Sequence, residues 1–366
     1  MTTLLFAGDT VLKHPTEHTI DSHLKKIIKD HAVASCNFEA PLSGTGSPLP
    51  KIGPAISQPA AAIDTLTEAG FNLFTLGNNH MMDYGRQGLE ATLTALDQTP
   101  HIGAGLSEAA TYQIFTTTIN GTTFGIMSIA EWGFGAHDTE QTCGFAWINH
   151  PSVPARIKAA RALVDVLIVQ VHAGVEDIGV PLPEWRECYR HLIEAGVDVV
   201  IGHHSHIVQG VEAYQDGHIF YSLGNFYFEK PQAPLSWRQG VLLSLSFTGA
   251  VLTAWRLIPT LAHDTGVTVD DTPERHALIE KNTALLTDTY SEYCNELVRT
   301  LWETRYKHFF TRSLGGFTTL RGSVRALLVF LRNPQKTIDY QLLTHNLSIE
   351  SHRYAATRAI RLLTQK

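Results

Sequence analysis

Short apolar runs alternate with longer helical patterns through the first two-thirds of the chain. The apolar runs are bounded by turn-forming residues and predict buried strands at residues 4–7, 32–37, 73–76, 124–129, 166–171, 197–201 and 219–222. Apolar positions at helical spacing predict helices between them at residues 59–69, 86–96, 154–164 and 183–195. Strands that alternate with helices are typical of a layered α/β sheet, which is the fold class we expect.

Two predicted β-hairpins interrupt this alternation. The first turns at Asn120 and Gly121, between residues 114–119 and 122–129, and Asn-Gly is the strongest short-range hairpin signal. The second joins residues 241–247 to 251–258 through Gly249. The sheet is therefore expected to be mixed, and the strand pattern is expected to end after Pro259.

The last hundred residues carry helical patterns only. We expect helices at residues 274–286, 291–309, 323–331 and 335–363, interrupted by Gly315-Gly316 and by Pro334. The chain is thus expected to have two parts, an α/β domain over residues 1–265 and a helical appendage over residues 270–366.

Charge is distributed unevenly between these two parts. The 366 residues carry a net charge of −7, yet residues 299–366 contain 12 Lys and Arg against 3 Asp and Glu. A basic tail on an acidic body either packs against that body or recruits an anionic polymer or a membrane surface, and both interpretations stay open. Nucleic-acid binding is not expected, because the body is acidic and its Arg residues do not alternate with aromatic residues.

Nothing in the sequence predicts secretion or a membrane span. The longest apolar stretches fall far short of the roughly 18 to 20 residues that cross a bilayer, and the first residues lack a basic leader. The four Cys residues form no CxxC pair, which favours reduced thiols over disulfides or a Cys-based zinc site. We expect a cytoplasmic protein, with association with the inner face of the membrane through the basic appendage as the alternative.

Potential metal ligands follow the predicted strands at their carboxyl ends, where open α/β sheets bind ligands. They are Asp9, Glu39, Asn79, His172, His204 and His206. Imidazole, carboxylate and amide groups are ligands of manganese, zinc and iron, and two-metal sites need a carboxylate that bridges the ions. A single His at a strand end is more often structural, so it is the ordered set that predicts a metal site. His204 and His206 lie two residues apart, which in an extended segment turns both to the same side.

The motifs around these residues resemble one known family. GD at 8–9, NFE at 37–39, GNNH at 77–80, GHHSH at 202–206 and SLGN at 222–225 are similar to the bacterial capsule-synthesis family of CapA type. That family includes poly-γ-glutamate synthesis proteins and is a branch of the calcineurin-like metallophosphatase fold. The resemblance runs from about residue 3 to about residue 260 and implies a two-sheet sandwich flanked by helices.

The resemblance also implies two divalent metal ions, which we expect to be manganese, zinc or iron. It assigns to the first ion Asp9, Glu39 and His206, and to the second ion Glu39, Asn79, His172 and His204. His80 is similar to the residue that protonates the leaving group. Four more residues are expected to contact the substrate or to support the ligands: Asn37, Glu176, His203 and Asn225.

One departure from the phosphatase pattern weakens the first metal position. That pattern has a His two residues after the first Asp, whereas this chain has Val11. The first position is therefore expected to be weak or vacant, although the capsule-synthesis branch shares this departure.

Three functions remain open at this stage. The leading hypothesis is a metal-dependent hydrolase that cleaves a phosphoester or γ-glutamyl amide bond during synthesis or processing of an anionic or polysaccharide surface polymer. The alternatives are a non-catalytic metal-binding assembly factor for a membrane-bound polymer synthase, contacted through the basic tail, and a plain cytosolic phosphoesterase. Residues 131–149 are interpreted as a lid or specificity loop, since long loops are uncommon unless functional. The chain has no GxSxG motif, so a serine nucleophile is not expected.

Overall fold

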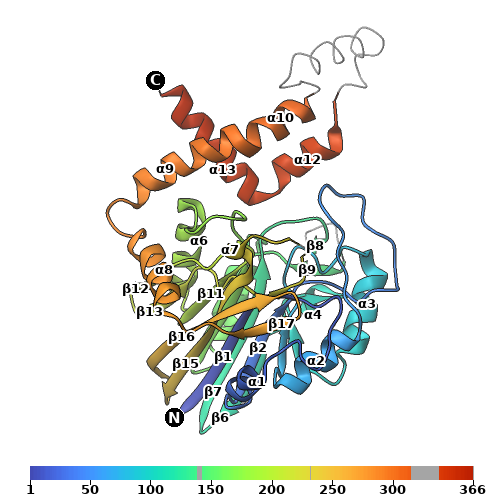
Figure 1. Ribbon diagram of the computed structural model, residues 1–366, viewed down its shortest axis with the longest axis vertical. Coiled ribbons are helices and arrows are strands. Elements are labelled where there is room, and N and C mark those ends of the chain that lie inside the picture. Colours follow the sequence, from blue (N-terminus) through green and yellow to red (C-terminus); the bar gives the residue numbers. More distant parts are fainter. Residues whose placement is uncertain (138–141, 231, 315–337, 366) are drawn as a thin grey trace. The chain divides into compact units, whose positions relative to one another are not determined.

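The computed structural model describes residues 1–137, 142–230, 232–314 and 338–365. The chain forms two compact units (Figure 1). The larger unit comprises residues 1–49, 55–181 and 185–287, and the smaller unit comprises residues 50–54, 182–184 and 288–366. Each unit is described separately below.

The larger unit contains an eight-stranded mixed sheet. Strand order is β17-β16-β15-β1-β2-β3-β4, and β14 also pairs with β1. Strands β1 to β4 and β14 run parallel, whereas β15 to β17 are antiparallel. The bounds are β1 Thr2–Val11, β2 Val33–Phe38, β3 Leu73–Thr75, β4 His101–Ile102, β14 Asn225–Phe228, β15 Gln239–Thr248, β16 Val251–His263 and β17 Gly266–Val269.

A six-stranded sheet and a small three-stranded sheet complete the strands of this unit. The six-stranded sheet has the order β12-β13-β11-β10-β7-β6, in which β7, β10, β11 and β13 are parallel. Its bounds are β6 Phe115–Ile119, β7 Thr122–Ala130, β10 Val166–His172, β11 Val199–His203, β12 Val211–Tyr214 and β13 Gly217–Phe220. The small sheet, in the order β5-β9-β8, is made of β5 Ala104–Gly105, β8 Ala136–His137 and β9 Gly144–Ala146.

Helices connect the strands of the larger unit and form the smaller one. In the larger unit they are α1 Ser22–Lys29, α2 Ala61–Ala69, α3 Gly85–Ala95, α4 Glu108–Thr111, α5 Val153–Arg161, α6 Pro183–Glu194, α7 Leu235–Arg238 and α8 Pro273–Ala284. The described helices of the smaller unit are α9 Tyr290–Leu301, the π-helical turn η1 Trp302–Tyr306, α10 Lys307–Ser313, α12 Tyr340–Ser348 and α13 Glu350–Thr364. Helix α8 contacts the six-stranded sheet, since the amide of Val211 in β12 donates to Thr283 Oγ1 at 3.1 Å.

Strand β1 shows why the apolar runs lack alternation. Successive side chains of a strand point to opposite faces of the sheet. Leu4 and Phe6 belong to the core between the two large sheets, together with residues of β7, β10 and β11. Leu5 and Ala7 belong to a second core, against helices α1, α2 and α3. A strand covered on both faces buries side chains on both of them, as β1 does for all its residues except the partly buried Thr3. This confirms the predicted two-sheet sandwich flanked by helices.

The predicted elements are largely confirmed. All seven predicted strands and both hairpins are present, and the first hairpin turns through positive φ at Asn120 and Gly121. The expectation that strands end after Pro259 is wrong, because β16 continues to His263 and β17 follows it. The predicted helix at 323–331 lies outside the described residues. The described part of 335–363 is two helices separated at Ile349, whose ψ is 116°.

No helix within the described ranges is long and apolar enough to cross a membrane.

Candidate metal centre

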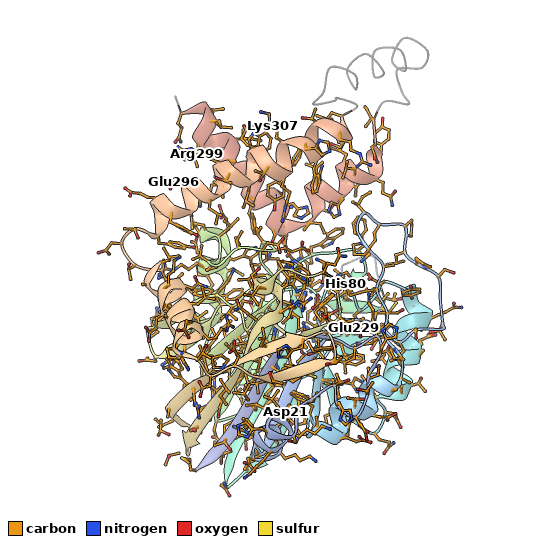
Figure 2. The ribbon with its side chains drawn as sticks, viewed as in Figure 1. Asp21, His80, Glu229, Glu296, Arg299 and Lys307 are labelled. Atoms are coloured by element: carbon orange, nitrogen blue, oxygen red, sulfur yellow. The ribbon has the colours of Figure 1, made fainter. Side chains whose placement is uncertain are left out.

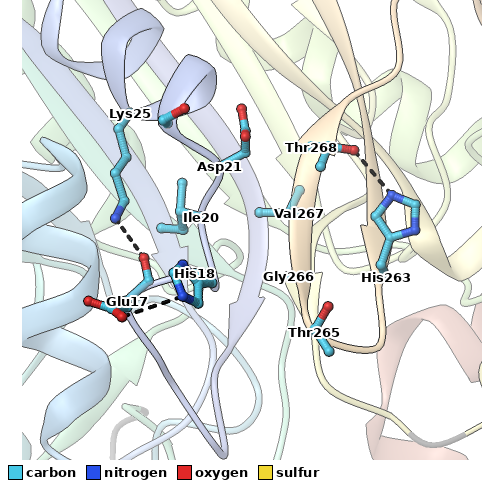
Figure 3. A pocket seen from close by; sticks show the side chains of 11 residues that line it. Glu17, His18, Ile20, Asp21, Lys25, His263, Thr265, Gly266, Val267 and Thr268 are labelled. Carbon is cyan, nitrogen blue, oxygen red and sulfur yellow. Dashed lines mark hydrogen bonds and ion pairs between the residues drawn. The ribbon is translucent and has the colours of Figure 1, made fainter.

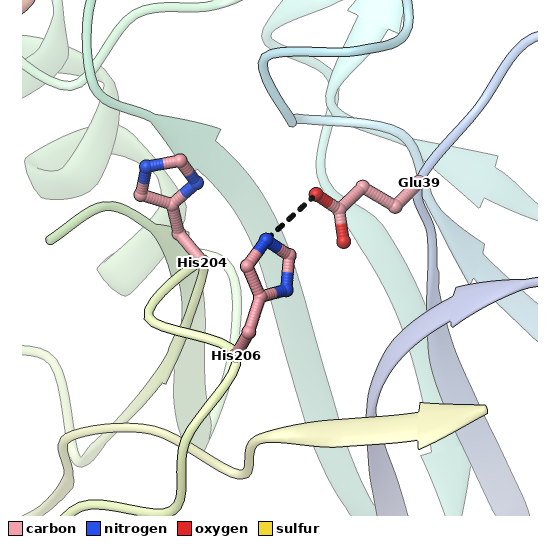
Figure 4. A group of neighbouring side chains, drawn as sticks. All are labelled: Glu39, His204 and His206. Atoms are coloured by element: carbon pink, nitrogen blue, oxygen red, sulfur yellow. Dashed lines mark ion pairs between the residues drawn. The ribbon is translucent and has the colours of Figure 1, made fainter. Parts of the chain in front are cut away.

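The carboxyl ends of strands from both large sheets bring the predicted ligands together. From the eight-stranded sheet, Asp9 lies in β1, Glu39 follows β2 and Asn79 follows β3; from the six-stranded sheet, His172 ends β10, and His204 and His206 follow β11. Figure 4 shows the Glu39 carboxylate directed toward the imidazole of His206. Residues far apart in sequence thus meet at one buried position.

The close approach of β1 to β14 fixes the position of the Asp9 backbone. The Asp9 amide donates to the carbonyl oxygen of Gly224 at 3.0 Å. A Cβ atom on Gly8 would lie only 1.8 Å from that same oxygen, so only glycine fits at position 8. The glycine that precedes Asp9 is therefore required by the backbone packing beside the site.

Asp9 is the most heavily contacted acid of the site. Its Oδ1 accepts a hydrogen bond from Asn37 Nδ2 at 2.7 Å, and its Oδ2 accepts one from the His204 amide at 3.1 Å. The same Oδ2 lies 3.2 Å from His206 Nδ1, and Oδ1 lies 3.5 Å from His203 Nδ1. Burial alone raises the pKa of Asp9, but the hydrogen bonds with His203 and His206 outweigh it and hold this pKa well below its usual value. Asp9 is thus a buried carboxylate.

Glu39 is the least satisfied acid of the site. It is fully buried, and neither carboxylate oxygen has a hydrogen-bond partner among the described residues. Burial and the neighbouring Asp9 charge raise its pKa well above the usual value. Its Oε1 lies 3.5 Å from His172 Nε2 and 4.0 Å from His206 Nε2, but neither contact is a hydrogen bond. A buried carboxylate without hydrogen bonds is costly unless it is neutralised or binds a cation. A divalent cation satisfies both oxygens, so the donor set here fits a bound metal.

Potential ligand atoms cluster in two groups that share Glu39. One group is Asp9, Glu39 and His172, and the other is Glu39, His204 and His206; within each group the atoms lie within 4.8 Å of one another. A carboxylate common to both groups is what a bridging ligand requires. Asn79 lies beside them, with its Oδ1 2.9 Å from His172 Nε2.

The two closing histidines lie in the loop directly after β11, in line with the predicted loop or strand-end pair. His204 and His206 have φ values of 79° and 58°, in the left-handed region, so the segment that carries them is not extended. Their rings lie side by side, with centroids 6.0 Å apart. The loop turns sharply and brings both rings toward Asp9 and Glu39. His206 is held in place by Asn225 Oδ1, 2.9 Å from its Nδ1.

Protonation differs among the three imidazoles. Burial, and then the neighbouring His204, lower the pKa of His172, and burial lowers the pKa of His204 to about 4. Burial also acts to lower the pKa of His206, but the charges of Glu39 and Asp9 outweigh it and raise that pKa to about 10. His172 and His204 are therefore neutral near pH 7, the state in which imidazole binds a metal.

Asn37 joins the two sheets at the floor of the site. Its Nδ2 donates to Asp9 Oδ1 and lies 2.9 Å from His172 Nδ1, and its Oδ1 accepts from Asn78 Nδ2 at 3.2 Å. The contact with Asn78 sets which way the amide points. Asn37 thus contacts Asp9 of the eight-stranded sheet and His172 of the six-stranded sheet, two members of the same ligand group.

His80, labelled in Figure 2, is paired with Asp83, an acid whose place in the sequence predicts the start of the next helix. His80 Nδ1 lies 2.7 Å from Asp83 Oδ2, and the same oxygen accepts the amide of Ile56 at 2.8 Å. Asp83 is completely buried. An Asp just before a helix suggests a cap, yet the cap position of α3 is Tyr84 and shows no side-chain cap bond. The position of Asp83, three residues after His80, is the feature of the sequence that indicates their pairing.

Three further residues lie around the ligands. Glu131, at the end of β7, has Oε1 3.2 Å from His204 Nε2, and no sequence motif marks it. His203 Nε2 lies 3.2 Å from Gln170 Oε1, and His203 Nδ1 lies 3.5 Å from Asp9 Oδ1, so this ring contacts both residues. Glu176 is half-buried, and its charge acts to raise the pKa values of His204 and His206.

Position 11 offers no ligand. Val11 is fully buried in a small apolar cluster with Ala40 and Ile56. The nitrogen ligand that the phosphatase pattern has at this position is absent from the site.

The fold and the site together define an α/β two-sheet protein with a candidate metal centre at its strand ends. The chain belongs to the family described as "Bacterial capsule synthesis protein PGA_cap", which matches residues 3–230. It is 30% identical over 223 residues to "Capsule biosynthesis protein CapA" of Bacillus anthracis, which covers 57% of this chain and 53% of that protein. It is 33% identical over 175 residues to "PGA biosynthesis protein CapA" of Bacillus subtilis, covering 46% of each. The chain spans about half the length of these relatives.

Solved structures give a weaker likeness. A putative 5'-nucleotidase from Staphylococcus aureus covers 83% of this chain and 66% of its own, with a TM-score of 0.44 and 15% identity. The NAD nucleotidase of Haemophilus influenzae has the same TM-score and identity, covering 76% of this chain and 55% of its own. This level of likeness assigns neither a substrate nor a reaction.

Proposed function

We propose that this protein is a metal-dependent hydrolase that acts on a bond of a capsule or surface polymer, during its synthesis or processing. The observation that carries the proposal is Glu39, whose two buried oxygens lack hydrogen-bond partners within the described chain and belong to both ligand groups. Membership of the capsule-synthesis family supports the polymer context. The names of the two Bacillus relatives support a poly-γ-glutamate-like or polysaccharide polymer as substrate.

The residues proposed to hold two divalent ions are Asp9, Glu39, Asn79, His172, His204 and His206, with Glu39 shared by both ions. The family resemblance assigns Asp9, Glu39 and His206 to one ion and Glu39, Asn79, His172 and His204 to the other, whereas the structure groups His172 with Asp9 and His206 with His204. Manganese, zinc and iron suit this mixture of imidazole and oxygen ligands. Ions bound here supply Lewis-acid polarisation of the substrate and lower the pKa of water. Asn37 and Asn225 orient Asp9 and His206, and the buried position limits access of bulk water.

His80 is proposed to protonate the leaving group. Asp83 accepts the Nδ1 proton, so exchange of a proton with the substrate is left to Nε2. A general acid oriented in this way contributes about 10²- to 10⁴-fold to a rate. Asp83→Asn removes the negative charge from the pair, and we expect turnover to fall at least tenfold while the bound metal stays unchanged.

A second candidate function is a non-catalytic assembly factor that holds an anionic polymer beside a synthase. The apolar packing of Val11 favours it, because one metal position has a nitrogen ligand fewer than the phosphatase pattern. In that case the protein binds polymer but shows no turnover.

Metal content and turnover on a defined panel test these functions. Purified protein is analysed for bound metal, and is then assayed with chromogenic phosphoesters, γ-glutamyl oligomers and polysaccharide fragments. We expect metal and turnover of a polymer fragment, both lost in His204→Ala and kept in the control His191→Ala, an exposed residue of α6. Bound metal without turnover of any substrate favours the assembly factor, and turnover of simple phosphoesters alone favours a plain phosphoesterase.

We also propose that the basic C-terminal unit contacts a membrane-bound polymer synthase at the inner face of the membrane. The charge surplus of residues 299–366 and the exposed Arg312 and Arg361 support this. The double variant Arg312→Glu and Arg361→Glu is expected to reduce recovery of the protein with the membrane fraction. Unchanged recovery contradicts the proposal.

A further inference from the structure

A cavity of about 360 Å³ opens beside the candidate metal centre in the larger unit. It is lined by the end of β14, the segment around α7 and the turn between β16 and β17. The residues that give it chemical character are Phe228, Glu229, Lys230, Arg238 and Asp264. None of the metal-ligand candidates lines it.

Aromatic side chains connect this cavity to the metal centre. The Phe228 ring lies against the His206 ring, with centroids 5.2 Å apart. Trp237 packs on both rings, with centroids 4.2 Å from His206 and 5.5 Å from Phe228. Since Phe228 lines the cavity and contacts a ligand candidate, a molecule in the cavity lies one aromatic ring away from the centre.

Lys230 offers a positive charge at this cavity. Its Nζ lies 3.5 Å from the centroid of the Trp237 ring. No carboxylate of the described residues forms an ion pair with Lys230. A cation–π contact at an exposed position contributes only about 0.5 to 1 kcal/mol, so a ligand carboxylate can attract the ammonium group without breaking a strong interaction.

Arg238 offers a second positive charge. Its Nη1 lies 3.0 Å from Asp264 Oδ1, but the Asp264 side chain is 85% exposed. Exposed ion pairs contribute about 0 to 1 kcal/mol, so a ligand carboxylate can replace Asp264 at little cost. Its Nε donates to the carbonyl oxygen of Ala233, which holds the guanidinium in place.

The other acid of the cavity is already engaged. Glu229 Oε2 accepts the backbone amides of Lys13 and His14 at 2.8 and 2.9 Å, and Oε1 pairs with His14 Nδ1 at 2.5 Å (Figure 2 labels Glu229). Both of its oxygens therefore contact the loop after β1, and no ion pair between Glu229 and Lys230 is found among the described residues.

A second cavity, of about 320 Å³ between α1 and β17, differs in this respect (Figure 3). There Lys25 Nζ donates to the carbonyl oxygen of Glu17, His18 lies 3.4 Å from the Glu17 carboxylate, and His263 bonds to Thr268. Two acids, Glu17 and Asp21, line it against one Lys, whereas the cavity beside Phe228 has two acids and two basic residues, so the second cavity attracts an anion less strongly.

We propose that the cavity beside Phe228 is a subsite for the carboxylate groups of an anionic polymer chain, bound by Lys230 and Arg238. It deepens the proposed function, on which it rests, by naming a carboxylated chain as the substrate class. The unit of the polymer that is held there contacts Phe228, whose ring packs on the ring of His206. The aromatic wall of Phe228 packs against the aliphatic part of each unit.

Direct binding to the full-length protein tests this subsite. The probes are a γ-linked glutamate pentamer and the matching neutral glutamine pentamer, compared by titration calorimetry at low and high salt. We expect the glutamate pentamer to bind at least tenfold more tightly than the neutral one, with affinity falling as salt rises. Lys230→Ala and Arg238→Ala each weaken binding about tenfold, Lys230→Arg retains most of it, and the control Lys281→Ala on the exposed side of α8 changes nothing.

The outcomes separate the subsite from the reaction. If His204→Ala abolishes turnover but keeps pentamer binding, the subsite stands apart from catalysis, and if no turnover exists at all, pentamer binding alone still supports it. Equal binding by Lys230→Ala and Arg238→Ala overturns the proposal. Inorganic phosphate that displaces the pentamer at similar concentrations also overturns it, because the cavity is then a general anion site.

Discussion

Single buried polar residues determine what the candidate centre can do. Glu39 has two oxygens without hydrogen-bond partners in the described chain, whereas Asp9 accepts from Asn37 and from the amide of His204. The carboxylate of Asp9 is thus oriented by hydrogen bonds, whereas the carboxylate of Glu39 has both oxygens available to bind a cation. This difference between two buried carboxylates supports metal binding more directly than the presence of either residue.

Asn37→Asp tests the orienting role at the residue scale. The variant is isosteric, but it removes the Nδ2 donor and sets a carboxylate where the amide now lies 2.7 Å from Asp9. We expect the free energy of unfolding to fall by about 2 to 4 kcal/mol in the metal-free protein, since a buried acceptor then faces a buried acceptor. Urea denaturation at pH 7 in the presence of a chelator measures it.

The matched control is Asn72→Asp. Asn72 Oδ1 accepts the amide of Ala34 at 2.9 Å, and this acceptor survives the change. A loss below about 1 kcal/mol is expected there. If both variants lose the same stability, Asn37 has no special role in orienting Asp9.

The candidate ligands were visible in the sequence because their motifs are short and local. GNNH and GHHSH mark Asn79, His204 and His206 without any knowledge of the fold. The contacts that Asp83 and Glu131 make in the site were not predicted, because each depends on which side chain the acid contacts after folding. His80 meets Asp83 within one turn, but Glu131 meets His204 only when β7 and the loop after β11 are brought together by the sheet.

At the scale of elements, the approach of β1 to β14 sets the geometry of the site. Gly8→Ala places a Cβ 1.8 Å from the Gly224 carbonyl oxygen, and backbone cannot move aside as a flexible side chain does. We expect a loss of about 3 kcal/mol or more of stability, together with loss of bound metal, since Asp9 is the next residue. Thermal unfolding and metal analysis measure the two effects.

Gly121→Ala is the comparison for this change. Gly121 has φ 81° in the first hairpin, and an added Cβ meets no atom within 4 Å. Only backbone strain is expected there, about 1 kcal/mol, with bound metal unchanged. Equal losses at both positions contradict the steric explanation for Gly8.

Helix α6 is joined to β12 by a charge cluster that depends on pH. Glu212 bonds to Arg186 and Arg190 of α6 and to Tyr221. Burial alone raises the pKa of Glu212, but these hydrogen bonds outweigh it and lower the pKa to about 2. Because the folded pKa lies below the ordinary value of 4.5, this stabilisation is present above pH 4.5 and is lost as pH falls toward 2.

Glu212→Gln tests this cluster. Between pH 6 and pH 3.5 the natural protein is expected to lose about 1 to 2 kcal/mol that the Gln variant does not lose, because Gln has no proton to gain. Urea midpoints of both proteins at the two pH values measure the difference. Parallel losses in the two proteins would falsify the assignment to Glu212.

The elements that the sequence did not predict have identifiable causes. Pro259 suggests the end of a strand because it lacks an amide proton. In the fold it lies one residue before β16 begins to pair with β17 at Thr260, so the missing donor interrupts no bond of that ladder. The short strands β8 and β9 are two and three residues long, too short for a period-two pattern, and β9 forms by pairing with both β8 and β5.

At the scale of the whole larger unit, the candidate centre lies where two separately formed sheets meet. Asp9, Asn37, Glu39 and Asn79 come from one sheet, and His172, His204 and His206 come from the other. An ion bound by residues of both sheets would therefore cross-link the two sheets. Sequence motifs predict the ligands, but only the fold shows that they join two sheets.

This position predicts that metal removal weakens the fold. A ligand that binds only the folded state at a concentration 100 times its Kd stabilises it by about 2.7 kcal/mol. For a unit of this size we expect a chelator to lower the Tm by roughly 5 °C or more, and added Mn²⁺ or Zn²⁺ to restore it. His204→Ala and His206→Ala, each measured with and without chelator, should show a Tm that no longer responds, whereas His191→Ala should respond fully. A Tm of the natural protein that is identical with and without chelator, at measured full metal occupancy, contradicts a cross-link between the sheets, because an ion bound by both sheets cannot leave without loosening their contact.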